Sequence, residues 1–146
     1  ELDNRGDHPF SNKQMRALIA LCGDIAVRNN IPAHRVLGHS DVAIGRKTDP
    51  GARFDWRRLA LSGVGVWPDL KTWHLNETVE MDPVMGKDAP RLRAQFVKQA
   101  ADYGYDPSLG LEQILSSLRQ HFAPHRSGPL SRFDFALLAA LNALCN

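Results

Sequence analysis

The stretch "GHSDVAIGRKTDPGARFDW", Gly38 to Trp56, interrupts an otherwise apolar pattern with many ionisable side chains. They are His39, Asp41, Arg46, Lys47, Asp49 and Asp55. Glycine and proline allow sharp bends in the same stretch, at Gly45, Pro50 and Gly51. A loop that doubles back in this way brings an imidazole and a carboxylate together, and the pair formed by His39 and Asp49 is a candidate metal site.

His39, Lys47 and Asp49 are considered as a set because their chemistry is complementary. A catalytic zinc normally has three protein ligands and keeps its fourth position for water, so two ligands from one loop do not complete the site. A lysine beside it stabilises an oxyanion, and a carboxylate accepts the proton of the water. A histidine that follows a strand is also commonly a structural hydrogen-bonding residue. Spacing alone leaves both interpretations open.

The amino-acid composition limits the class of protein and the kinds of partner that we expect. The chain has 146 residues, 43% of them hydrophobic and 23% charged, which is typical of a globular protein with a buried core. The formal charge of +2 is spread without a Lys/Arg block, so we expect no nucleic-acid partner. No apolar run approaches the ~20 residues of a transmembrane segment. Cys22 and Cys145 provide neither a disulfide framework nor a zinc-ribbon spacing.

Local signals predict two helices and one strand in the first half of the chain. Ser11 and Gln14 form a capping box, and "NNIP" at Asn29–Pro32 ends the helix that follows. Its apolar positions recur at helical spacing: Met15, Leu18, Leu21, Cys22 and Ile25. "RVLGH", Arg35 to His39, predicts a short buried strand that ends at His39. A short amphipathic helix begins near Phe54 with Asp55 as its cap.

The second half predicts a small helical domain. A boundary lies near residues 71–86, where no period is sustained. Three helical patterns follow, over residues 88–103, 108–122 and 131–144. Gly104 closes the first of these helices, and Ser131 with Asp134 caps the last.

The pattern "VLGHSDVAIGRKTDPGARFDWRRL", Val36 to Leu59, resembles the signature of the zinc-dependent N-acetylmuramoyl-L-alanine amidases, the type-2 amidase family of the AmpD and AmiD groups. The resemblance implies that His39 and Asp49 are zinc ligands and that Lys47 is catalytic. "ELDNRG" at the start resembles the family's glutamate-bearing strand, which implies a catalytic role for Glu1. The third ligand, a histidine, is expected upstream of Glu1, in an N-terminal segment absent from this chain.

The same resemblance predicts the architecture. We expect an α/β fold in which residues 1–72 form the C-terminal part of a mixed-sheet zinc amidase domain. Residues 73–87 form a linker, and residues 88–146 form an all-α three-helix domain of the peptidoglycan-binding type, most like the AmiD group. "LRQHFAP", Leu118 to Pro124, carries that second likeness, although residues 117–119 depart from the usual pattern. A purely structural cap is the alternative for the helical tail. The expected partner of this chain is the missing N-terminal segment of the same protein. That segment is either the second piece of a nicked molecule or was lost by truncation.

The implied function is a zinc hydrolase of cell-wall turnover or recycling. It cleaves the amide between N-acetylmuramic acid, or its anhydro form, and the L-alanine of the peptidoglycan stem peptide. Arg46 is a candidate to bind a muropeptide carboxylate, or else it braces Asp41 or another acid of the loop. A location in the periplasm or at the outer membrane is expected, with the cytoplasm as the alternative. The rival function is a noncatalytic peptidoglycan or muropeptide recognition module, and a phage-type lysin is a third.

Three tryptophans admit two roles. Trp56, Trp67 and Trp73 are able to stack on sugars, but a tryptophan beside a short helix or a proline is more often a packing residue. We therefore favour packing for all three.

Overall fold

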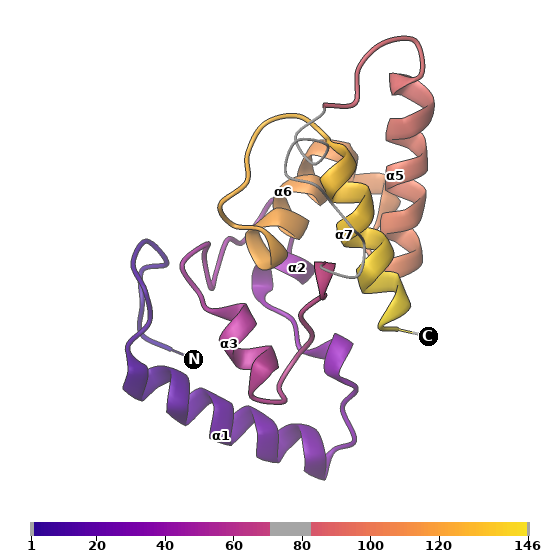
Figure 1. Cartoon of the computed structure of the whole chain (residues 1–146). Helices are drawn as coiled ribbons and strands as arrows, with labels where there is room; N and C mark the ends of the chain where they lie inside the picture. Colours follow the sequence, from indigo (N-terminus) through magenta and orange to yellow (C-terminus); the bar gives the residue numbers. More distant parts are fainter. Residues whose placement is uncertain (1, 71–82, 146) are drawn as a thin grey trace. The chain divides into compact units, whose positions relative to one another are not determined.

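The computed structural model describes residues 2–70 and 83–145 (Figure 1). Its elements are α1 (Asn12–Arg28), η1 (Ala33–Arg35), α2 (His39–Val42), α3 (Trp56–Leu61), α5 (Ala89–Tyr103), η3 (Pro107–Leu109), α6 (Leu111–Phe122) and α7 (Arg132–Ala143). The chain forms two compact units. The first contains Glu1–Trp67 and Gln120–His125, and the second contains Pro68–Arg119 and Arg126–Asn146. The last residues of α6 therefore belong to the first unit.

Helix α1 begins and ends where the local signals predict. The Ser11 hydroxyl accepts from the Gln14 amide at 3.2 Å, and the Ser11 amide donates to Gln14 Oε1 at 2.9 Å. Met15 is buried and the other apolar positions are partly buried, except Leu21, which is 58% exposed. The expected buried stripe is thus wrong at Leu21, because only the face of α1 nearest Met15 packs against the unit's core.

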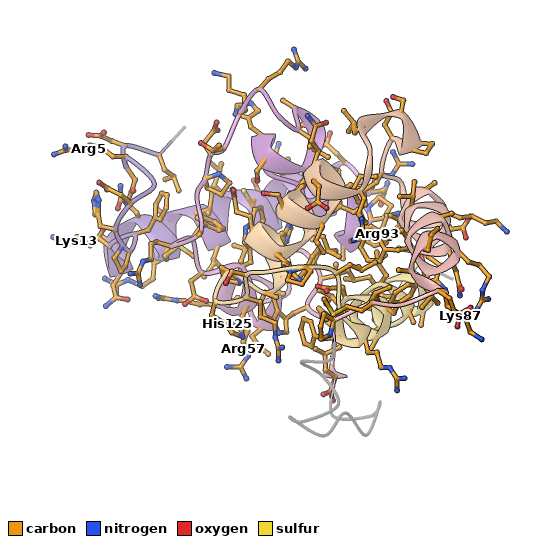
Figure 2. The ribbon with its side chains drawn as sticks, turned by 90° about the horizontal axis from the view of Figure 1, so that it is seen from above. Arg5, Lys13, Arg57, Lys87, Arg93 and His125 are labelled. Atoms are coloured by element: carbon orange, nitrogen blue, oxygen red, sulfur yellow. The ribbon has the colours of Figure 1, made fainter. Side chains whose placement is uncertain are left out.

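The core of the first unit forms where α1 meets the segment around α3. Its buried members are Met15, Phe54, Trp56, Leu59 and Val64. The Asp55 carboxylate accepts from the Arg58 amide at 3.0 Å and caps α3, as expected. Figure 2 shows Arg57 extending outward from α3, so this short helix has one apolar face and one solvated face.

The expected strand from Arg35 to His39 is wrong. Ala33–Arg35 forms the short helix η1, and His39 is the first residue of α2. Val36 and Gly38 do have extended backbones, but no strand pairs with them among the described residues, and a strand requires a partner ladder. The opening segment from Leu2 to Phe10 is likewise not a strand. Over residues 2–70 and 83–145 the only β-pairing is an isolated bridge between Pro83 and Ser131, so the mixed sheet stays a prediction.

The second unit has the helices that the sequence predicts. Helices α5 and α7 lie side by side (Figure 1), with Phe96 and Phe135 in edge-to-face contact at 5.5 Å between ring centroids. Gly104 ends α5 with φ +124°. Asp134 accepts from the Ser131 amide at 2.8 Å and from its hydroxyl at 2.7 Å. The two local signals for helix ends are therefore confirmed.

The same carboxylate also anchors a buried ion pair. Arg119 donates through Nε to Asp134 Oδ1 at 2.8 Å and through Nη2 to Oδ2 at 2.7 Å. Its remaining donors reach the carbonyl oxygens of Gly128 and Pro129. Arg119 and Asp134 thus each form several hydrogen bonds within the unit.

None of the helices in the described ranges has the length and apolar character needed to cross a bilayer. Cys22 is partly buried and Cys145 is exposed, and neither forms a disulfide.

Candidate metal and catalytic site

The loop after α2 returns to the start of that helix and brings His39 against Asp49. The Nδ1 atom of His39 is hydrogen-bonded to Oδ2 of Asp49, and the Ser40 amide donates to the Asp49 carbonyl at 2.9 Å. Both side chains remain open to solvent, with exposed fractions of 63% and 58%. The convergence expected from the glycine and proline positions is confirmed. The roles of these two residues as ligands stay a prediction.

Glycines make this return possible because the backbones approach one another closely. Gly51 has φ +87°, and a Cβ atom there would lie 2.5 Å from the carbonyl oxygen of Gly6. A Cβ atom at Gly38 would lie 2.7 Å from Pro50 Cδ. Gly38, next to His39, therefore packs against the Pro50 ring, and Gly51, two residues after Asp49, packs against the Gly6 backbone. Any larger residue at Gly38 or Gly51 displaces the loop.

The local electrostatics favour the ionised form of Asp49. The hydrogen bond from His39 holds the pKa of the Asp49 carboxyl below its usual range, and the nearby positive charge of Lys47 lowers it further. Lys47 itself is exposed, and its amide donates to the Ala43 carbonyl at 3.0 Å. The loop thus presents a carboxylate, an imidazole and a cationic amine to the same region of solvent.

The donor set of this pair fits a zinc ion. Imidazole nitrogens and carboxylate oxygens are ordinary zinc ligands, so His39 and Asp49 would be able to hold the ion. Neither side chain is committed to the core. Within residues 2–70 and 83–145 there is no group of three His, Cys, Asp or Glu side chains able to hold a metal.

The other predicted site residues have different outcomes. Glu1 lies outside the described residues. Arg46 is exposed and forms no ion pair with any described side chain, so its proposed contact with a substrate carboxylate stays a prediction. The alternative, in which Arg46 braces Asp41 or another loop acid, also stays a prediction, and the described side-chain partner of Asp41 is His121.

The tryptophans follow the packing interpretation where the structure describes them. Trp56 is 6% exposed and belongs to the core of the first unit. Trp67 is partly buried against the same core and faces Phe122 at 6.1 Å between ring centroids. Trp73 lies outside the described residues.

Two residues of α6 contact the loop in ways that the sequence did not indicate. His121 Nδ1 hydrogen-bonds to Asp41 Oδ2 at 2.9 Å, and both side chains are buried. Gln120 Nε2 donates to the Thr48 carbonyl at 2.6 Å. Their partners lie 80 and 72 positions away in the chain, and no local spacing signals a pairing at that separation.

Comparison with known proteins finds similarity to one group of amidases. A family model described as N-acetylmuramoyl-L-alanine amidase matches residues 1–52, the part that contains His39, Lys47 and Asp49. Over 140 residues the chain is 33% identical to the N-acetylmuramoyl-L-alanine amidase AmiD of Escherichia coli K12, covering 85% of this chain. The chain is related to the AmpD/AmiD group of N-acetylmuramoyl-L-alanine amidases.

Other AmpD/AmiD amidases extend the likeness. The 1,6-anhydro-N-acetylmuramyl-L-alanine amidase AmpD of Enterobacter cloacae is 40% identical over 59 residues, or 40% of this chain and 32% of that protein. The solved AmiD complex with anhydro-N-acetylmuramic acid-L-Ala-D-gamma-Glu-L-Lys matches at a TM-score of 0.77 and 31% identity, covering 91% of this chain and 52% of that one. The solved complex of AmpDh3 from Pseudomonas aeruginosa with anhydromuramic pentapeptide matches at a TM-score of 0.72 and 28% identity. The match covers 92% of this chain and 54% of that one.

The chain spans only part of these amidases. It covers 48% of the length of AmiD and 32% of the AmpD relative. The AmiD match takes in most of both units, whereas the AmpD match is confined to about the length of the family model. The match to AmiD therefore extends into the helical second unit.

Proposed function

We propose that this chain carries part of the active site of an amidase that acts on peptidoglycan. The bond cleaved joins N-acetylmuramic acid, or its anhydro form, to the L-alanine of the stem peptide. The observation that carries the proposal is the convergence of His39 with Asp49 inside the segment that matches the amidase family. The solved AmiD and AmpDh3 complexes with anhydromuropeptides support this substrate class.

Zinc is the proposed cofactor, with His39 and Asp49 as two of its protein ligands. The proposed third ligand is a histidine that precedes residue 1. When bound, zinc lowers the pKa of water towards ~7 and polarises the carbonyl of the scissile amide. The ionised state of Asp49 favours this assignment, since a ligand carboxylate must be deprotonated.

Protein groups then carry the proton and the developing charge. Glu1 is proposed to orient the attacking water and to accept its proton as general base. Lys47 is proposed to stabilise the negative oxygen of the tetrahedral intermediate, since its side chain lies near enough to Asp49 to lower the pKa of that carboxyl. The exposed guanidinium of Arg46 is proposed to bind a carboxylate of the stem peptide.

The remaining proposals concern the setting of this chemistry. A mixed sheet formed with the N-terminal segment of the same protein would complete the catalytic domain. The helical second unit is proposed to bind peptidoglycan, because the AmiD match extends across it. A periplasmic or outer-membrane location follows from that substrate, with the cytoplasm as the alternative.

Hydrolysis of purified muropeptides tests the proposal. We expect the full protein to release free stem peptide from muropeptides, and a chelator to abolish the release until zinc is restored. Supplying muramyl and anhydromuramyl substrates in parallel identifies the preferred sugar. Binding that survives chelation without any cleavage would instead establish the noncatalytic recognition module.

A further inference from the structure

We propose that His121 is a positioning residue of the metal site, acting through Asp41 to hold His39 at the start of α2. The proposal rests on the function proposed above for His39 and Asp49. It gives the end of α6 a role at the site that is separate from the binding of glycan. The argument uses only residues of the first unit.

Asp41 is the centre of this arrangement. Its Oδ2 atom accepts from the Gly38 amide at 2.8 Å and from His121 Nδ1 at 2.9 Å. Gly38 and Asp41 flank His39 in the sequence, so the carboxylate ties the two sides of the proposed ligand together.

The His121 ring is itself held in place by stacking. Its centroid lies 3.8 Å from that of Trp56, with an angle of 18° between the planes. His121 is 3% exposed and Trp56 is 6% exposed, so water does not compete for either face. Trp56 also lies directly beneath Gly38, where a Cβ atom would be 3.1 Å from its Cζ2. The His121 ring, Trp56 and the start of α2 therefore pack directly against one another.

The neighbouring residue holds the other end of the loop. Gln120 Nε2 donates to the carbonyl of Thr48 at 2.6 Å, and Thr48 immediately precedes Asp49. Consecutive residues of α6 thus contact the segment next to each proposed ligand. Such outer contacts orient ligands, and their loss typically weakens metal binding by about 10- to 100-fold.

A matched pair of variants tests this role. His121→Phe keeps a ring to stack on Trp56 but removes the Nδ1 donor. His125→Phe changes an exposed histidine of the same segment, labelled in Figure 2. Zinc affinity, measured by competition with a chromophoric chelator, is expected to fall about tenfold in His121→Phe and to stay unchanged in His125→Phe. His121→Asn, whose amide donor is attached at Cγ as Nδ1 is, is expected to restore most of the affinity.

Hydrogen–deuterium exchange gives a readout that needs no zinc. We expect amides of residues 38–49 to exchange about tenfold faster in His121→Phe, because the variant loses one buried hydrogen bond. The amides of α1 should keep their protection. Unchanged exchange in that segment, or equal zinc affinity in the two phenylalanine variants, would overturn the positioning role. If the wild-type full protein binds no zinc but His121→Phe shows the expected faster exchange, the proposed function is refuted, and His121 is left only with holding the His39 segment in place.

A milder variant decides the matter if His121→Phe fails to fold. Gln120→Ala removes only the bond to Thr48 from a half-exposed side chain. Faster exchange confined to residues 46–49 supports the role of α6, and unchanged exchange there contradicts it.

Discussion

The pair Arg119–Asp134 in the second unit and the pair His39–Asp49 in the first unit both join a carboxylate to a nitrogen base, but they differ in exposure. Arg119 and Asp134 are 8% and 0% exposed, and both ends of the pair have further hydrogen-bond partners. His39 and Asp49 are 63% and 58% exposed, and their side chains face one another at the surface. A buried pair with several hydrogen bonds stabilises the fold, whereas an exposed imidazole and carboxylate are accessible to a ligand such as a metal ion.

The largest expected effect comes from removing the exposed carboxylate. Asp49→Ala deletes a proposed ligand, so zinc content measured by elemental analysis should fall to near zero and amidase activity with it. With both proteins freed of zinc, the melting temperature should stay at the wild-type value, because this side chain contributes little packing. Retained zinc together with retained activity would contradict the assignment of Asp49.

Removing the buried carboxylate should do the opposite. Asp134→Ala leaves the Arg119 guanidinium uncompensated in the interior, which typically costs about 3–5 kcal/mol of unfolding free energy. Chemical denaturation measures the loss, and elemental analysis should show that zinc binding at low denaturant is retained. A cost below about 1 kcal/mol would mean that the pair does not support the second unit in this way.

Lys47→Ala separates binding from catalysis within the exposed region. Loss of a group that stabilises an oxyanion typically reduces kcat by about 10²-fold or more, while zinc content should not change. Lys13→Ala, an exposed lysine on α1, serves as the control and should leave kcat unaltered. Unchanged kinetics in Lys47→Ala would remove its catalytic role.

The smallest expected effect on stability comes from breaking an exposed ion pair that is not proposed to bind a ligand. Asp24 and Arg28 form an i,i+4 ion pair on α1 at 2.6 Å, with exposed fractions of 57% and 63%. Asp24→Ala should reduce the unfolding free energy by less than about 0.5 kcal/mol and should leave zinc content and activity unchanged. A larger loss of stability would show that exposed pairs in this chain hold the fold as buried ones do.

Local patterns predicted the parts of the fold that local physics determines. The caps at Ser11, Asp55 and Ser131 depend on residues within one helical turn, and each forms as expected. The approach of His39 to Asp49 was also predictable, because both lie in one short loop with glycine and proline at its bends. Their proposed chemistry came from the resemblance of the whole motif to the amidase family, because spacing alone left the metal site and the structural role both open.

Long-range contacts could not be predicted in the same way. The partnership of Asp41 with His121 joins residues 80 positions apart, and the sequence suggested a contact with nearby Arg46 instead. Arg119 was seen only as a departure from a motif, although it anchors a buried ion pair. The strand expected before His39 failed because β-branched composition signals extended backbone but does not supply a partner.

Anomalous diffraction at the zinc edge, on crystals of the full protein grown with zinc, tests the central claim most directly. The account predicts one peak within about 2.0–2.2 Å of both an imidazole nitrogen of His39 and a carboxylate oxygen of Asp49. A peak that contacts only one of these residues, or density that shows the two side chains still hydrogen-bonded to each other with no metal between them, would contradict it.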